Sequence, residues 1–142
     1  MNIIEITKYS EEILSALNEL LPQLSSSAPP LTDVTLLRII QSESSHLLMA
    51  EEGGQFYGSL TLVVFDIPTG TRAWIEDVVV SKDSRGKGVG KLISERAVSL
   101  AHELGAKTID LTSRPSRVIA NNLYKKIGFV QRETNIYRFE NT

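Results

Sequence analysis

Apolar residues recur at helical spacing near the start of the chain. Leucine and isoleucine occupy positions 13, 14, 17, 20 and 21, which predicts a helix that begins after Ser10 as N-cap and ends at Pro22. A second helix is expected after Thr32, another N-cap residue, with apolar positions 36, 37, 39 and 40 on its inner face. Residues 2–6 are expected to form a short strand ahead of both helices.

The pattern then changes to extended segments, at residues 46–52, 55–65 and 72–80. The turn sequences EGG (52–54) and DIPTG (66–70) separate them, so we predict an antiparallel meander of three strands. Within the third segment, apolar–polar alternation breaks at Glu76 and Asp77. A β-bulge would produce such a break.

The last third predicts helix, strand, helix and strand. An apolar stripe over 89–104 ends at Gly105, and residues 107–112 form the next strand. Ser116 is expected to cap a helix that ends at Gly128, and residues 136–139 (IYRF) are predicted to form a closing strand. This order predicts an α/β (α+β) fold with a mostly antiparallel sheet flanked by helices, in a single domain over residues 1–142.

Composition excludes several classes of function. The 142 residues include no cysteine, so thiol nucleophiles and thiolate metal sites are ruled out. His46 and His102 lie far apart, and we expect no metal. A net charge of -2 provides no global attraction for nucleic acid. Without a membrane-length apolar run or a signal-peptide pattern, a cytoplasmic protein with no membrane partner is expected.

Residues 83–92, DSRGKGVGKL, combine glycines with cations just before a helix. Glycine lets backbone N–H groups converge on one point, and the start of a helix adds further amides, which together suit a diphosphate. The spacing lacks the first glycine and the hydroxyl of a Walker A loop, and its third glycine comes one residue early for a dinucleotide fingerprint. A glycine-rich strand-to-helix turn with solvated lysines is the alternative interpretation of this stretch.

Two motifs in the second half of the chain resemble the GNAT superfamily of N-acetyltransferases. The family pattern Arg/Gln-x-x-Gly-x-Gly/Ala is met by Arg85, Gly88 and Gly90. The second pattern, Leu/Phe-Tyr-x-x-x-Gly-Phe, is met over residues 123–129. The resemblance implies the GNAT fold and acetyl-coenzyme A (acetyl-CoA) as co-substrate. IEDVVV and RGKGVGKLI are partly similar to the glucosamine 6-phosphate N-acetyltransferase branch, a likeness that weakens after residue 105.

The resemblance also implies which residues hold acetyl-CoA. In the family, the strand before the glycine loop splays from its neighbour, and the pantetheine arm pairs with it. A fully paired core strand is the alternative. Many members carry an asparagine at the position of Arg117, so Asn121 or Arg117 itself is expected to replace it. The expected cofactor-binding residues are Val78, Val79, Val80, Arg85, Gly86, Lys87, Gly88, Val89, Gly90, Lys91 and Asn121.

Acetyl transfer to an amine needs a base, an oxyanion donor and a proton for the leaving thiolate. The resemblance favours Glu76 as base, directly or through water, although it could instead anchor the substrate or simply be exposed. Asp77, its neighbour on the strand, would face the other way. Tyr124 is expected to protonate the thiolate, with a structural core tyrosine as the alternative. The oxyanion donor is expected to be a backbone N–H near Val78.

These inferences predict an N-acetyltransferase that uses direct attack in a ternary complex. The acceptor is left open among an amino sugar phosphate, a peptide lysine or N-terminus, and a small amine. Arg114 and Arg117 are expected either to hold an anionic substrate or cofactor phosphate, or to be solvated. A non-catalytic acetyl-CoA-binding sensor or interaction module is the alternative function. GNAT proteins often pair through edge strands, so the resemblance also implies a homodimer.

Overall fold

The structure, a computed structural model, describes all 142 residues, and contacts within the chain divide it into two compact units. The first unit covers Met1–Thr112 and the second covers Ser113–Thr142, and each is described by itself. The first unit contains, in chain order, β1 (Asn2–Glu5), α1 (Glu11–Leu24), α2 (Asp33–Gln41), β2 (Ser45–Glu52), β3 (Gln55–Ile67), β4 (Gly70–Val80), a single 3-10 turn (Lys82–Ser84), α3 (Val89–Glu103) and β5 (Thr108–Asp110). The second contains α4 (Val118–Ile127).

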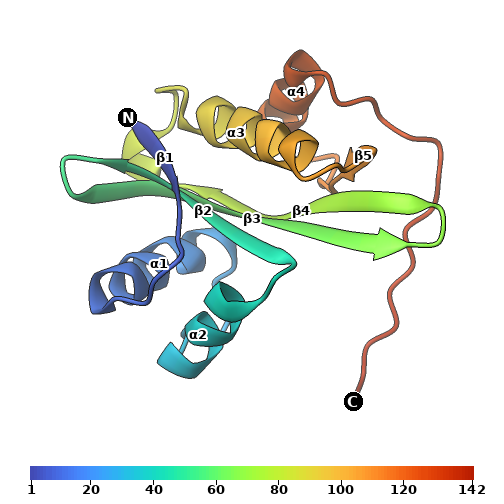
Figure 1. Ribbon diagram of the computed structural model, residues 1–142. Coiled ribbons are helices and arrows are strands. Elements are labelled where there is room, and N and C mark those ends of the chain that lie inside the picture. Colours follow the sequence, from blue (N-terminus) through green and yellow to red (C-terminus); the bar gives the residue numbers. More distant parts are fainter. The chain divides into compact units, whose positions relative to one another are not determined.

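One five-stranded sheet organises the first unit, in the order β1-β2-β3-β4-β5. Strands β1 to β4 pair antiparallel, and β5 pairs parallel to β4. Helices α1 and α2 lie against one face of the sheet and α3 against the other (Figure 1). The predicted meander, β2–β3–β4, is confirmed, as is the mostly antiparallel α/β fold.

The first two helices begin where the sequence predicted. The Ser10 hydroxyl accepts a hydrogen bond from the Ile13 N–H at 3.1 Å, and the Thr32 hydroxyl accepts one from the Thr35 N–H at 3.2 Å. The predicted end of α1 at Pro22 was wrong, because the helix continues to Leu24. Proline removes one hydrogen bond and crowds the carbonyl four residues earlier, but it does not affect the N–H groups of the residues after it, which can stay helical for the rest of the last turn.

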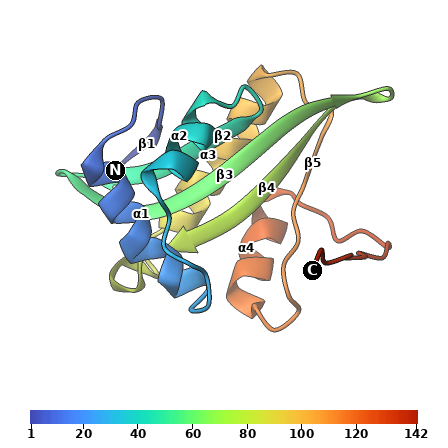
Figure 2. The ribbon, with the colours of Figure 1, turned by 90° about the horizontal axis from the view of Figure 1, so that it is seen from below.

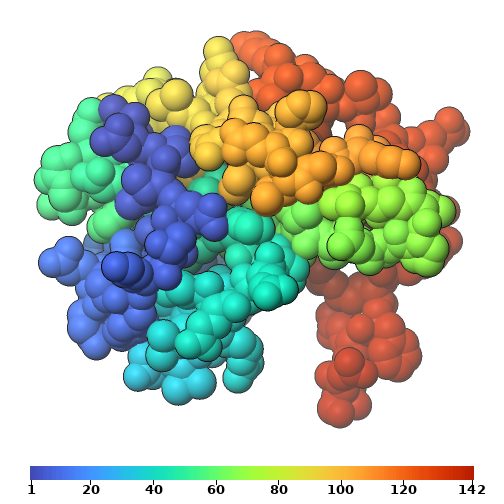
Figure 3. Space-filling view, viewed as in Figure 1, coloured from blue at the N-terminus to red at the C-terminus, as the bar shows by residue number.

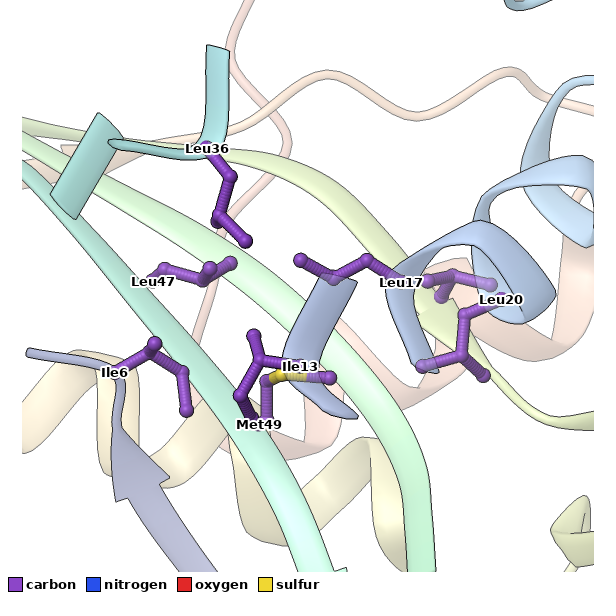
Figure 4. Packing of buried hydrophobic residues seen from close by; sticks show 8 residues of the cluster. Ile6, Ile13, Leu17, Leu20, Leu36, Leu47 and Met49 are labelled. Carbon is purple, nitrogen blue, oxygen red and sulfur yellow. The ribbon is translucent and has the colours of Figure 1, made fainter. Parts of the chain in front are cut away.

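The space between the sheet and helices α1 and α2 is filled by apolar side chains. In Figure 4, leucine and isoleucine side chains from α1 and α2 meet those of β2. Leu36 and Met49 are completely buried there, and Leu17 and Leu20 nearly so. Atoms of the two helices form one continuous blue-to-cyan layer in the space-filling view (Figure 3). Burial of this kind is the main stabilising contribution to a fold.

The hairpin of β3 and β4 is longer than the layer formed by α1 and α2. It extends past both helices to its turn at residues 68–69 (Figures 1 and 2). The sheet face on the side of α1 and α2 is therefore not covered by these helices over the outer part of the hairpin. Thr61, Val63, Trp74 and Glu76 share this face, because Thr61 pairs with Glu76 and Val63 pairs with Trp74.

The second unit differs from the prediction at both ends of its helix. Ser116 is not the N-cap; that position is held by Arg117, which makes no side-chain capping bond. The C-terminal end at Gly128 is confirmed. The predicted strand at 136–139 was wrong, because residues 129–142 contain no strand. Its apolar–polar pattern is local, whereas a strand needs a partner for its backbone groups, and Tyr137 and Phe139 are about nine-tenths exposed (88% and 90%).

Candidate functional site

The predicted bulge in β4 is present at Asp77. Ser59 pairs with Val79 and Thr61 pairs with Glu76, so Asp77 and Val78 together stand opposite the single residue Leu60. Asp77 has φ of 52°, the left-handed region that non-glycine residues seldom occupy. Such strain is kept only where the surrounding structure enforces it, and it commonly marks functional sites. The bulge bends β4 directly before Val78–Val80.

Beyond its first half, β4 has no strand partner on the side of β5. The parallel pairing with β5 joins Arg72, Ala73 and Trp74 to residues 108–110 and stops there. On the other side, Val79 and Val80 still pair with β3. On the side of β5, residues 75–80 of β4 therefore form an unpaired sheet edge. An extended ligand can pair with the backbone groups of such an edge.

The loop that follows β4 is fixed at its base and open at its tip. Ser84 is buried, and its single hydroxyl proton is shared between the backbone carbonyls of Ser81 (3.2 Å) and Tyr57 (3.4 Å). The Lys82 N–H donates to the Gln23 side-chain oxygen at 2.9 Å, which joins the loop to α1. From Arg85 to Gly88 every residue is exposed. A firm base under an exposed tip keeps the loop shape without a ligand.

Free backbone amides gather where this loop enters α3. Gly88 is the N-cap and has φ of 80°, a conformation that suits glycine. The first paired amide is that of Leu92, which donates to the Gly88 carbonyl at 3.1 Å, and the N–H groups of residues 88–91 donate no hydrogen bond within the protein. Arg85, Lys87 and Lys91 are exposed beside them. Unpaired amides, the positive end of the helix dipole and three cations form an anion-binding arrangement.

Gly58 on β3 allows α3 to begin close to the sheet. A Cβ atom at this position would lie 3.1 Å from the Val79 carbonyl oxygen and 3.1 Å from Cγ1 of Val89. Val89 is buried as the first residue of α3. The missing side chain of Gly58 therefore lets the amide-rich helix start lie directly beside the end of β4.

Glu76 lies immediately before the bulge and is exposed. Its carboxylate accepts a hydrogen bond from the indole N–H of Trp74 at 2.7 Å. Asp77 is also exposed, and its side chain forms no hydrogen bond or ion pair. Both acids were predicted from the sequence as candidate site residues, but the contact with Trp74 was not. Alternation on the strand, which places residues 74 and 76 on one face, was the signal that could have found it.

Tyr124 and Asn121 belong to the second unit. Burial raises the pKa of the Tyr124 phenol above its ordinary value of 10.0, and the nearby Arg117 charge opposes this in part. The Tyr124 ring meets the Phe129 ring edge-on, with centroids 5.9 Å apart and an interplanar angle of 68°. The Asn121 side chain donates to the Arg114 carbonyl at 3.0 Å. A protonated phenol is the form that a proton donor requires.

The two histidines remain separate. His46 contacts Glu5, with 2.9 Å between Nδ1 and the carboxylate, whereas His102 is exposed on α3. No group of three or more histidine, aspartate or glutamate side chains is arranged to hold a metal ion. None of the helices combines the length and apolar character that crossing a bilayer requires.

A bulged strand with a free edge, followed by an amide-rich helix start, defines a site for a ligand that is extended at one end and anionic at the other. The family model for acetyltransferases of the GNAT family matches residues 12–129 of the chain. The protein therefore belongs to the GNAT acetyltransferase family.

Individual relatives are distant. A Bacillus subtilis (strain 168) protein with the provisional name [ribosomal protein bS18]-alanine N-acetyltransferase is 27% identical over 106 residues, which cover 73% of this chain and 66% of the relative. An Agrobacterium tumefaciens strain C58 protein, provisionally named an acetyltransferase, superposes with a TM-score of 0.88 at 22% identity, covering 99% of this chain and 100% of that one. The aminoglycoside N-acetyltransferase AAC(6')-Iy, solved with CoA, gives a TM-score of 0.80 at 18% identity, covering 99% and 95%. These superpositions confirm the GNAT fold.

Proposed function

We propose that this protein is an N-acetyltransferase that moves acetyl from acetyl-CoA to a primary amine by direct attack in a ternary complex. The observation that carries the proposal is the set of unpaired amides at residues 88–91 beside the free edge of β4. Family membership supports acyl transfer, and the absence of cysteine excludes an acetyl-cysteine intermediate. The whole chain is proposed to act as one domain.

The residues of the first unit fit acetyl-CoA. The amides of Gly88 to Lys91 would bind its pyrophosphate, assisted by Arg85 and Lys87, because amides and cations converge there. Val78, Val79 and Val80 would pair through backbone groups with the amides of the pantetheine arm, as an added strand does. When bound, acetyl-CoA supplies the acetyl group as an activated thioester.

Two side chains are proposed to move protons. Glu76 would accept the proton of the attacking ammonium, directly or through water, since its carboxylate is exposed next to the bulge. Tyr124 would donate its phenolic proton to the departing thiolate, and its raised pKa keeps that proton on the phenol at neutral pH. Asn121 is proposed to contact the cofactor, although its side-chain amide already donates a hydrogen bond to the Arg114 carbonyl. Direct attack leaves no covalent enzyme intermediate.

The acceptor amine remains a matter for screening. The name of the Bacillus subtilis relative suggests a protein N-terminal alanine, so a peptide with this N-terminus is the first acceptor to test. Aminoglycosides are the second, because the substrate class is named for a protein of the same fold. Glucosamine 6-phosphate is the third, on the motif resemblance described above.

Thiol release from acetyl-CoA, measured against this panel, tests the proposal. We expect turnover with at least one amine and a fall of about 100-fold in kcat for Glu76→Gln, the range expected when a general base is lost. Tight binding of acetyl-CoA without turnover for any amine would instead support a non-catalytic sensor or interaction module. An unchanged kcat in Glu76→Gln would remove Glu76 from the mechanism.

Two further expectations concern the state of the protein in the cell. We propose a cytoplasmic location and a homodimer joined through sheet edges. Light scattering of the purified protein tests the dimer, and a monomer at micromolar concentration would contradict it. Fractionation of cells that express the full chain tests the location.

A further inference from the structure

Trp74, the single tryptophan of the chain, donates a hydrogen bond to Glu76, the proposed base. Trp74 and Glu76 lie two residues apart on β4, so their side chains extend from the same face of the sheet. The indole Nε1 is 2.7 Å from Glu76 Oε1, a short distance typical of a hydrogen bond to a charged acceptor. Asp77, with φ of 52°, follows at once. The bond therefore holds a carboxylate at the residue where the strand bends.

The chemistry of this bond leaves part of the carboxylate available. An indole N–H is a donor only, whereas an ionised carboxylate has two oxygens and can accept several hydrogen bonds. Trp74 donates to Oε1, and no hydrogen bond described within the first unit involves Oε2. A free glutamate on an exposed strand would sample many rotamers, and fixing it costs side-chain entropy. The indole contributes that fixation before any substrate arrives.

We infer that Trp74 is a positioning residue that orients the Glu76 carboxylate toward the acceptor amine. The inference rests on the proposed role of Glu76. The half-buried indole is held by the sheet, across from Val63. Its N–H fixes one carboxylate oxygen, and the other points to the incoming ammonium. Trp74 itself transfers no proton.

The chain offers a matched control for this arrangement. Tyr9 donates through its hydroxyl to Oε1 of Glu11 at 3.0 Å, which is also an aromatic donor bonded to a glutamate two residues further on. This pair lies at the start of α1 and includes none of the residues assigned to the proposed site. Tyr9→Phe removes a bond of the same kind outside the proposed site, so general effects of losing such a bond appear in both variants.

A double-mutant cycle tests the inference with the best amine of the acceptor panel. We expect Trp74→Phe, which keeps an aromatic ring but loses the N–H, to lower kcat about tenfold, in line with one lost hydrogen bond to a charged group. In the Glu76→Gln background the same change should alter kcat by less than about twofold, because the carboxylate it orients is gone. Tyr9→Phe should leave kcat within about twofold.

Fluorescence gives a second readout that does not depend on turnover. Trp74 is the only tryptophan, so indole emission reports on this position alone. Glu76→Gln should change the emission of the free protein, whereas Glu11→Gln should not. Saturating amine added to the CoA-bound protein should also change it. Circular dichroism on each variant checks that the fold is retained.

The possible outcomes distinguish a failure of the positioning role of Trp74 from a failure of the proposed N-acetyltransferase function. If Glu76→Gln reduces kcat but Trp74→Phe does not, the positioning role is wrong and the proposed base stands. Equal effects of Trp74→Phe in both backgrounds would mean a structural role only, which also overturns the inference. A chain without turnover for any amine contradicts the proposed function and the inference together.

Discussion

Two regions of the chain differ in burial and in hydrogen bonding. They are the core between the sheet and helices α1 and α2, and the loop at residues 85–91. In the core, Leu36 and Met49 are fully buried, and the cluster consists of apolar side chains. In the loop, the residues from Arg85 to Gly88 are exposed, and the four amides of residues 88–91 have no partner. Folding explains the first region completely. Every helix start leaves amides unpaired, but folding does not explain why three cations lie beside these amides, whereas the proposed binding of acetyl-CoA would.

The largest effect is expected in the core. Leu36→Ala should lower the free energy of unfolding by about 3 kcal/mol, because it removes a buried side chain and leaves a cavity. Urea denaturation measures this change. Leu36 is not part of the loop at residues 85–91. At a temperature where the variant is folded, its affinity for acetyl-CoA should therefore stay within about twofold of the wild-type affinity. A loss of affinity larger than the loss of folded protein would mean that the two regions are not separate.

Tyr124 is next in size and tests chemistry without changing the loop. Tyr124→Phe removes only the phenolic oxygen, so kcat should fall between about 10-fold and 100-fold, the effect expected for a lost proton donor. Affinity for acetyl-CoA should remain near that of the wild type. Tyr137→Phe is the control, since Tyr137 is 88% exposed and should not affect kcat. Full activity in Tyr124→Phe would exclude its role as proton donor.

The two ends of α3 offer a matched comparison of glycines. Gly88 (φ 80°) and Gly105 (φ 86°) are both left-handed, and a Cβ at either would meet nothing within 4 Å. Each change to alanine should therefore cost about 1 kcal/mol of stability from backbone strain alone. Only Gly88→Ala should weaken acetyl-CoA binding, by about tenfold, because only Gly88 belongs to the proposed pyrophosphate site. Equal affinities in the two variants would contradict the binding role of the loop.

The pH dependence of stability is the smallest effect. Because the folded protein holds the Tyr124 proton above the ordinary pKa of 10.0, this contribution to stability is complete below pH 10 and is lost as pH rises through the folded pKa. Urea denaturation should show wild type losing more stability than Tyr124→Phe above pH 10. Parallel pH curves for the two proteins would mean that burial does not perturb this phenol.

Much of the fold was readable from local patterns. Ser10 and Thr32 cap their helices as predicted, and the break at Glu76 and Asp77 is a bulge. These features depend on a few neighbouring residues, so the sequence contains the whole signal. The bulge was predicted from a lost alternation, and the structure added that Asp77 is strained and that the β4 edge beside it is free.

The errors occur where structure depends on distant partners. The segment IYRF alternates as a strand should, yet no strand forms at 136–139, because pairing is decided outside the segment. Leu92 is one of the apolar residues in the stripe predicted over 89–104, but it is 44% exposed. The hydrogen bond between Lys82 and Gln23 joins residues 59 positions apart, which periodicity does not encode. Strand alternation places Trp74 and Glu76 on one face but does not specify the hydrogen bond between them. The roles of the site residues stay predictions for the same reason.

Calorimetric titration of the full chain with acetyl-CoA tests the central claim most directly. The claim is that amides of residues 88–91 bind the pyrophosphate of this ligand. We predict saturable heat with one site per chain, a Kd in the micromolar range, and binding about tenfold weaker in Gly88→Ala but not in Gly105→Ala. Absence of heat at millimolar ligand, together with no competition by CoA, would contradict it.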